Sequence, residues 1–196
     1  MESINSEKII LASKSERRKD LLEQIGLNFE IFPANINEDM VSINNPEEYA
    51  KELSFLKAKN TALFNPGSWI LGADTIVVIQ DKILGKPQSV TDAIKMLNQL
   101  NNCEHSVYTG FCVINREKKI IIKKSVKTKV NFKSLTDGEI HWYVNTGESF
   151  GKAGAYAIQG IGAFLVKGIA GSYSNVVGLP VCEVVETLEK LNIIQI

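Results

Sequence analysis

The sequence predicts an α/β protein built on a mixed β-sheet flanked by helices. Strand-like and helix-like segments alternate along most of the 196 residues, which is typical of helices packed on a sheet. Two strand-like segments, 107–114 and 119–132, are joined by a short polar turn and predict an antiparallel hairpin within that sheet. The length suits one domain, 1–196, with room for two lobes that share a core.

The N-terminal half predicts strands and helices in turn. A short apolar strand at 9–12 leads through a polar loop into a helix that stops at Gly26, and a strand at 28–32 follows. The segment 45–64 opens with Asn-Pro-Glu-Glu, which supplies the cap, the first-turn proline and the acidic start of a helix. The apolar run 69–79 predicts a strand in the interior of the sheet.

The C-terminal half continues the alternation. In the second hairpin strand, apolar residues alternate with Lys123, Lys127 and Lys129, which indicates a solvated strand face rather than an RNA-binding surface. The remaining expected elements are a helix at 91–100, a helix at 136–145 that a Thr-x-x-Glu capping box opens, a strand near 164–169 and a last helix from residue 179.

The composition excludes several functional classes. Basic and acidic residues number 22 each, so neither a nucleic-acid surface nor an anionic-membrane surface is expected. No apolar run approaches the roughly 18 residues of a membrane span, and the polar N-terminus is unlike a signal peptide. Cys103, Cys112 and Cys182 are expected to be reduced thiols in or near the core of a cytoplasmic protein. A catalytic pair of Cys103 with His105 is the less favoured interpretation.

The polar stretch 13–18 predicts an anion-binding site. It follows a buried strand and opens a helix, whose first turn carries unpaired N–H groups and the positive end of the helix dipole. Ser13 and Ser15, with Lys14, Arg17 and Arg18, add hydroxyls and cations that suit a phosphate chain. The alternative is a serine-capped helix with a solvated basic first turn.

Two carboxylates are candidates for a metal site. Asp74 interrupts an otherwise apolar strand, and burying a carboxylate without a partner costs several kcal/mol. Asp74 therefore either accepts from backbone donors or faces a cleft as a metal ligand or base. Glu38, in an acidic loop, is the natural second carboxylate, although taken alone it could be an ordinary surface acid. Two carboxylates beside a polyphosphate suit Mg²⁺, with Mn²⁺ as the alternative.

Further cations and a small-residue segment complete the candidate site. Lys57 in a helix and Lys86 in a Gly-Lys-Pro turn would join Arg17 and Arg18 to balance a metal-bound triphosphate, although each lysine alone fits an ordinary surface position. The segment 152–162 is rich in glycine and alanine, which would let a planar ligand approach the backbone near Gln159. The chain contains neither a P-loop nor a complete dinucleotide fingerprint.

The chain resembles the Maf family of nucleoside triphosphate pyrophosphatases, also described as septum-formation inhibitors. The resemblance runs from about residue 9 to residue 191, and five ordered motifs carry it: Ile-Leu-Ala-Ser-x-Ser-x-Arg-Arg at 10–18, Gly-Ala-Asp-Thr at 72–75, Gly-Lys-Pro at 85–87, Lys-Ala-Gly-Ala-Tyr-x-Ile-Gln-Gly at 152–160 and Tyr-Ser-Asn-Val-Val-Gly-Leu-Pro at 173–180. The wording of the fourth motif is similar to that of the branch acting on dTTP and UTP.

The resemblance implies a fold like that of inosine triphosphatase, an elongated mixed sheet with two lobes and a central cleft. It also implies Mg²⁺-dependent hydrolysis of a nucleoside triphosphate to the monophosphate and pyrophosphate, and it makes a homodimer a common assembly. The implied catalytic residues are Asp74, Glu38, Lys57 and Lys86, with Asp74 and Glu38 as metal ligands. The implied substrate-binding residues are Ser13, Arg17, Arg18, Thr75 and Gln159.

A physical argument supports Gln159 as the residue that reads the base. Its amide can donate to O4 and accept from N3–H of uracil or thymine, whereas cytosine presents the reverse pattern and would leave polar groups unpaired. Two alternatives stay open: a pyrophosphatase for methylated GTP or other modified nucleotides, and a non-catalytic nucleotide-binding regulator of septum formation. Lys14, Glu16 and Gly151 depart from the family's usual residues, which bears on affinity and metal preference.

Overall fold

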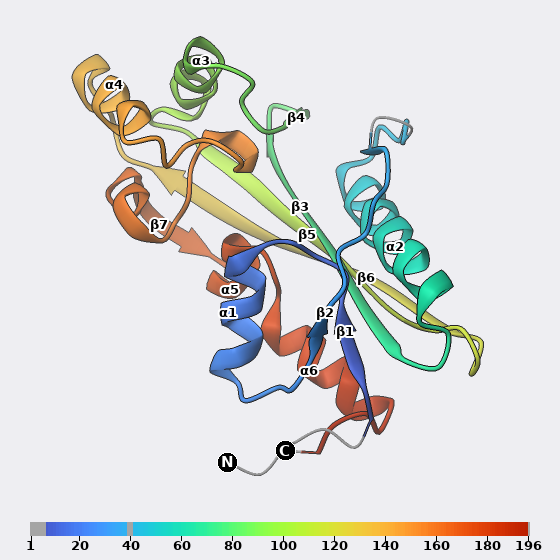
Figure 1. The fold of residues 1–196 in the computed structure, drawn as a ribbon. Helices are drawn as coiled ribbons and strands as arrows, with labels where there is room; N and C mark the ends of the chain where they lie inside the picture. The colour runs from blue at the N-terminus through green and yellow to red at the C-terminus, as the bar shows by residue number, and fades with distance from the viewer. Residues whose placement is uncertain (1–6, 39–40, 196) are drawn as a thin grey trace. The chain divides into compact units, whose positions relative to one another are not determined.

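The computed structural model describes residues 7–38 and 41–195 and confirms a mixed α/β fold. Asp39 of the acidic loop and the first six residues lie outside the described residues. Seven strands form one sheet in the order β2-β1-β3-β5-β6-β7, with β4 paired to β3 (Figure 1). The strands are β1 Ile9–Leu11, β2 Glu30–Ile31, β3 Trp69–Ile79, β4 Lys82–Leu84, β5 Glu104–Asn115, β6 Ile120–Phe132 and β7 Val166–Ala170.

The sheet contains both parallel and antiparallel pairs. β1 pairs in parallel with β2 and β3, while β3–β4 and β6–β7 are antiparallel. The helices are α1 Glu16–Gln24, α2 Pro46–Phe64, α3 Val90–Leu100, α4 Asp137–Asn145, α5 Tyr173–Val177 and α6 Val181–Lys190, with short 3₁₀ helices η2 Ala153–Ala155 and η3 Gly160–Leu165. In the described part of the chain, no helix combines the length and the apolar character that a membrane span requires.

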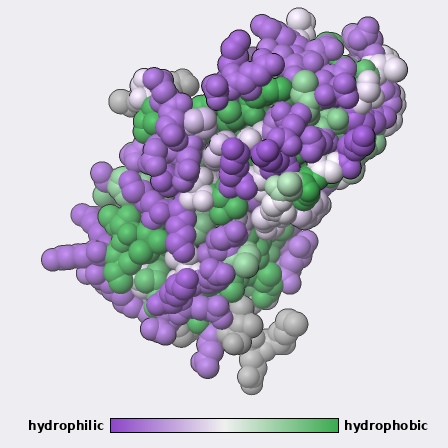
Figure 2. All heavy atoms as spheres, turned by 180° about the vertical axis from the view of Figure 1, so that it is seen from behind, coloured by the Kyte–Doolittle hydropathy of each residue, from purple (hydrophilic) through white to green (hydrophobic). Residues whose placement is uncertain are grey.

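The chain divides into two compact units. Unit 1 contains the described residues of 1–74, 109–126 and 178–196, and unit 2 contains 75–108 and 127–177. In unit 1, α1 and α6 lie on one side of β1 and α2 lies on the other (Figure 1). On the face drawn in Figure 2, hydrophilic side chains alternate with smaller hydrophobic patches.

Local signals in the sequence set several element boundaries. Gly26 follows α1 with a φ of 73°, a conformation that favours glycine and ends the helix. The Asn45 side chain accepts from the N–H groups of Glu47 and Glu48 and starts α2. Thr136 and Glu139 form the expected capping box of α4. These boundaries were predictable because each depends on residues close in sequence.

Glycine lets α2 lie directly against the sheet. A Cβ on Gly72 of β3 would lie 2.4 Å from the Ser54 carbonyl oxygen, and a Cβ on Gly110 of β5 would lie 2.2 Å from that of Ala50. Both carbonyls belong to α2, so any larger residue on either strand would push the helix away. Ala58 and Ala62 of α2 complete this contact in a cluster with the β1 residue Ile10.

Unit 2 has its own core, which includes His105. The His105 Nε2 atom lies 2.8 Å from the Tyr156 hydroxyl, and the ring packs edge-on against Phe132 and Tyr156. Burial lowers the pKa of His105 to about 4, so the ring is neutral at pH 7. The hydrogen bond to tyrosine identifies His105 as a core residue and gives no support to a catalytic pair with Cys103.

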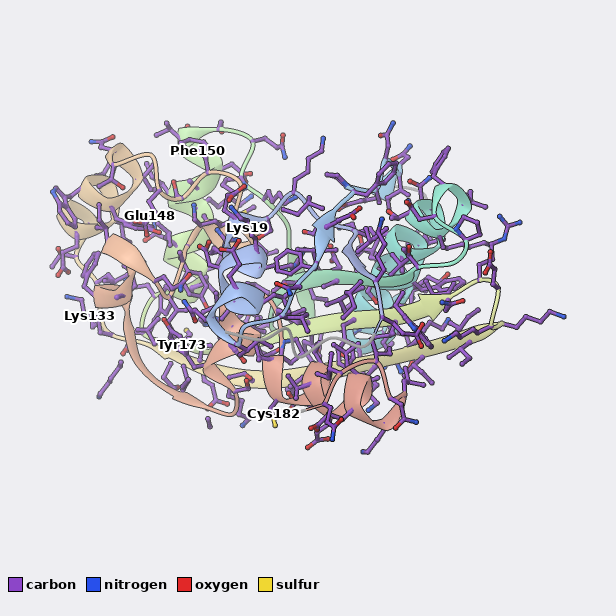
Figure 3. The ribbon with its side chains drawn as sticks, turned by 60° about the horizontal axis from the view of Figure 1, so that its bottom comes forward. Lys19, Lys133, Glu148, Phe150, Tyr173 and Cys182 are labelled. Atoms are coloured by element: carbon purple, nitrogen blue, oxygen red, sulfur yellow. The ribbon has the colours of Figure 1, made fainter. Side chains whose placement is uncertain are left out.

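Some sequence expectations needed correction. The second strand spans only Glu30–Ile31 instead of 28–32. Cys112 is buried and Cys103 half-buried as expected, but Cys182 is exposed on α6, where its sulfur points away from the ribbon (Figure 3). Cys182 occupies the outward face of an amphipathic helix whose inward face carries Val184 and Leu188. The helical spacing of Val184 and Leu188 places Cys182 on the opposite face, which the apolar character of its immediate neighbours alone does not show.

Candidate active site

Parallel pairing of β1 with β3 brings the polar loop and Asp74 to the same region of unit 1. Leu11 lies opposite Leu71, and the Ala12 N–H donates to the Leu71 carbonyl at 2.9 Å. Because the two strands run in the same direction, the residues after Leu11 follow alongside the residues after Leu71. Ser13 therefore leaves β1 next to the stretch of β3 that carries Asp74.

The contact between Gly72 and α2 places Lys57 beside Asp74. Gly72 and Asp74 are two residues apart on β3, so both face the same side of the sheet. That side is covered by the turn of α2 from Ser54 to Ala58, and Lys57 lies within this turn. The glycine thus supplies the space that lets a lysine of the helix reach a carboxylate of the strand.

Lys57 bridges the two candidate carboxylates. Its Nζ lies 2.5 Å from Asp74 Oδ1 and 2.8 Å from Glu38 Oε1. Asp74 is 7% exposed and the Lys57 side chain 13%, whereas the Glu38 side chain is 42% exposed. The buried Asp74 is therefore balanced by an ammonium group, a partner that neither sequence interpretation of this residue had included.

Arg18 is held by two further groups of unit 1. Its Nη1 donates to Ser13 Oγ at 3.0 Å, and its Nε donates to the Gly178 carbonyl at 2.8 Å. Ser13 Oγ also accepts from the Ser15 N–H at 3.2 Å, so this hydroxyl orders the loop as well as the arginine. The planar guanidinium can serve both acceptors at once, which a lysine ammonium on a flexible stem does less well.

Charges of both signs surround Arg18. Its pKa is lowered chiefly because the half-buried guanidinium is partly removed from water, and the negative charge of Asp74 opposes this effect. Arg17 lowers the pKa of Arg18 further, while Glu38 raises it. All four groups are thus close enough to interact, and the ordinary pKa of arginine is high enough to keep Arg18 charged.

Lys14 and Glu16, which depart from the family's usual residues, lie at the surface of the protein. Both residues are exposed, and Glu16 Oε2 lies 3.6 Å from Lys19 Nζ, one turn along α1. The Glu16 side chain is thus directed along the helix surface towards a neighbouring cation. The structure gives no reason for Glu16 to weaken an anion site at Ser13 and Arg18.

The protein supplies only part of the ligands that a hard divalent cation such as Mg²⁺ needs. Among residues 7–38 and 41–195, no group of three or more His, Cys, Asp and Glu side chains is placed to hold a metal. Asp74 and Glu38 are two carboxylates that share one cation, Lys57. Mg²⁺ commonly takes one or two carboxylates and completes its shell with phosphate oxygens and water, so this pair fits it together with a triphosphate.

The other three predicted site residues belong to unit 2. Thr75 is half-buried directly after Asp74 on β3, Lys86 is exposed in the turn after β4, and Gln159 is half-buried before η3. The Gly154 N–H donates to the Gly85 carbonyl at 3.0 Å, which ties the lysine turn to the small-residue segment. Ser13, Arg17, Arg18, Glu38, Lys57 and Asp74 belong to unit 1.

Gly178 is a site residue whose role the sequence did not reveal. Its carbonyl accepts from Arg18, which lies 160 residues earlier in the chain. Gly178 has a φ of 135°, a conformation that favours glycine, and it precedes the Leu-Pro pair that leads into α6. The Gly-Leu-Pro sequence signals a turn, but no sequence pattern indicates which side chain that turn will bind.

Comparison with known proteins decides the family. The family model described as Maf-like protein matches residues 8–191. The chain belongs to the Maf family. It is 51% identical over 185 residues to a dTTP/UTP pyrophosphatase of Ruminiclostridium cellulolyticum, covering 94% of this chain and 96% of the relative. A dTTP/UTP pyrophosphatase of Geotalea uraniireducens is 47% identical over 187 residues, which cover 95% of this chain and 96% of the relative.

A solved structure described as that of the Staphylococcus aureus Ham1 protein was also matched. It has 12% sequence identity and a TM-score of 0.48, and the match covers 64% of this chain and 71% of that one. This likeness is too low to carry an argument. Membership of the Maf family rests on the sequence matches and agrees with the motifs found in the sequence.

Proposed function

We propose that this chain hydrolyses nucleoside triphosphates, dTTP and UTP foremost, to the nucleoside monophosphate and pyrophosphate. The observation that carries the proposal is the buried Asp74, which Lys57 links to Glu38 in the same charged cluster as Arg18. Such a group of acids and cations suits proton transfer and phosphate binding together. The proposal is supported by relatives that share 51% and 47% sequence identity with this chain and are named dTTP/UTP pyrophosphatases.

In this proposal, Asp74 accepts a proton from the attacking water. The water oxygen forms a bond to the α-phosphorus, and the bond from that phosphorus to the bridging oxygen breaks as pyrophosphate leaves with the electron pair. Lys57 orients the two carboxylates, because its ammonium binds both. Arg17, Arg18 and Lys86 are assigned to the negative charge on the departing pyrophosphate.

A divalent cation, Mg²⁺ or Mn²⁺, is part of the proposal. Asp74 and Glu38 would hold it together with phosphate oxygens, and when bound it would neutralise phosphate charge and favour the attacking hydroxide. Gln159 is assigned to the edge of the pyrimidine and Thr75 to the substrate. Homodimer formation and a cytoplasmic location belong to the same proposal, the latter supported by three unpaired cysteines in the described chain.

The deciding experiment measures pyrophosphate release from a panel of canonical and modified nucleoside triphosphates, with Mg²⁺, with Mn²⁺ and with a chelator. Metal-dependent release that is fastest with dTTP and UTP is the expected result. Release that is fastest with a methylated purine nucleotide would keep the reaction and overturn the assignment of Gln159. Nucleotide binding without any release of pyrophosphate would favour the alternative function, a non-catalytic nucleotide-binding regulator of septum formation.

A further inference from the structure

Glu148 receives hydrogen bonds from three donors around the segment that carries Gln159. It lies in the stretch after α4 (Figure 3). Its Oε2 accepts from the Ile161 N–H at 2.9 Å, and its Oε1 accepts from the Gly162 N–H at 2.9 Å. The hydroxyl of the fully buried Tyr143 donates to Oε1 at 3.2 Å. The carboxylate thus satisfies two N–H groups of the first turn of η3, one with each oxygen.

Tyr143 holds the other flank of the same segment. Its hydroxyl accepts from the Ala157 N–H at 3.2 Å while donating to Glu148. Ala157 is two residues before Gln159, and Ile161 is two residues after it. A single pair of side chains therefore fixes the backbone on both sides of Gln159, and all of these residues belong to unit 2.

Two glycines allow the segment to close around this pair. Gly160 has a φ of 68°, and a Cβ there would lie 2.8 Å from Glu148 Oε2. A Cβ on Gly162 would lie 2.3 Å from the Ala157 carbonyl oxygen and 2.8 Å from the Tyr143 hydroxyl. Side chains at either position would collide with the groups that make the hydrogen bonds, so the backbone conformation and the clamp depend on each other.

We infer that Tyr143 and Glu148 clamp residues 157–162 and that Glu148 is thereby a positioning residue for base selection. This inference rests on the proposed function, in which the Gln159 amide recognises the edge of uracil or thymine. An amide discriminates between donor and acceptor patterns only if its own orientation is fixed, and a residue on a loop is fixed only as well as its backbone. The clamp supplies that fixed backbone.

The test compares Glu148→Gln and Tyr143→Phe with the wild-type protein. Glutamine keeps the size of Glu148 but replaces one acceptor oxygen by an NH₂ group, which would face a backbone N–H. We expect the preference for UTP over CTP, measured as the ratio of kcat/KM values, to fall by about tenfold or more, the effect of losing one hydrogen bond to a charged group. Tyr143→Phe removes both hydroxyl contacts and should reduce the same ratio.

A matched control separates positioning from general loss of stability. Thr136→Ala removes the cap of α4, the helix that carries Tyr143, without touching residues 157–162. It should lower the melting temperature and leave the UTP-to-CTP ratio as in the wild type. If Thr136→Ala changes the ratio as much as Glu148→Gln does at equal loss of stability, the assignment of Glu148 to base selection is wrong.

Amide hydrogen exchange tests the clamp without any nucleotide. In the Glu148→Gln protein, the Ile161 and Gly162 amides should exchange at least about tenfold faster, while amides of β5 keep their wild-type rates. Unchanged exchange would overturn the clamp, and faster exchange with unchanged substrate ranking would overturn its role in selection. Failure of the wild type to hydrolyse any nucleotide would instead overturn the proposed function and, with it, the role in selection.

Discussion

Lys57 Nζ lies 2.5 Å from Asp74 Oδ1, although one residue belongs to a helix and the other to the middle of a buried strand. They meet because Gly72 lets α2 approach β3 closely at the turn that carries Lys57. The ammonium also contacts Glu38, so one cation holds two acids that would otherwise repel each other. The ion pair of Asp74 with Lys57 therefore depends on the packing of α2 on the sheet.

Replacing Asp74 by asparagine should abolish most of the turnover and leave the fold intact. The substitution keeps the size of the side chain but removes the base, while Lys57 retains Glu38 as a partner. We expect kcat for UTP to fall by about a thousandfold, with a near-native circular dichroism spectrum. Asp81→Asn, at the exposed β3–β4 turn, is the matched control and should keep wild-type turnover. Near-normal kcat for Asp74→Asn would refute the assignment of the base.

Replacing Gln159 by alanine should weaken the choice of base more than the stability of the protein. Gln159 is half-buried and its amide is assigned to the edge of the pyrimidine, so its loss should reduce the kcat/KM ratio of UTP to CTP by about tenfold or more. Competition between the two nucleotides in one reaction would measure this ratio directly. A substrate ranking identical to that of the wild type would contradict a base-reading role for Gln159.

Replacing Gly72 by alanine should destabilise unit 1 and impair turnover together. The added methyl group would lie 2.4 Å from the Ser54 carbonyl oxygen, so α2 must shift and carry Lys57 with it. Overpacking of this kind costs about 1–3 kcal/mol, which urea denaturation would measure. Gly168→Ala in β7 is the control, because a Cβ there meets nothing within 4 Å. Equal effects of the two substitutions would argue against the close contact at Gly72.

His105 should make the stability of the protein depend on pH below neutrality. Burial lowers its pKa in the folded state to about 4, from an ordinary value of 6.5. The unfolded chain therefore binds the proton more readily between these two values, and the free energy of unfolding falls as the pH drops from 6.5 towards 4. The full contribution, present above pH 6.5, is about 3 kcal/mol.

Measuring unfolding by urea at several pH values would test this prediction. The His105→Gln variant should show a shallower loss of stability between pH 6.5 and pH 4 than the wild type, because glutamine does not titrate. Carboxylates also titrate in this range, so the difference between the two proteins carries the information. Parallel pH dependences would mean that His105 is not protonated on unfolding.

Much of the fold could be predicted because its signals are local. The limits of β3 at 69 and 79 follow from a run that is apolar apart from Gly72, Asp74 and Thr75, and the start of α4 follows from its capping box. The length of β2 could not be predicted, since only two residues of the expected strand 28–32 pair with β1, and the sequence does not show which residues will pair. The prediction that Cys182 lies in or near the core was wrong for a related reason. Its exposure depends on which face of α6 meets the core.

The order of amino acids specifies which chemical groups this protein carries: a serine and two arginines at a helix start, two candidate carboxylates, and a glutamine among small residues. The tertiary structure decided which of these groups meet, because Lys57 reaches Asp74 only through the space at Gly72, and Arg18 reaches a carbonyl 160 residues away. It also decided that Glu148 anchors the segment of Gln159. Residue types are fixed by the chain, whereas their distances depend on how helices and strands pack, which no local pattern records.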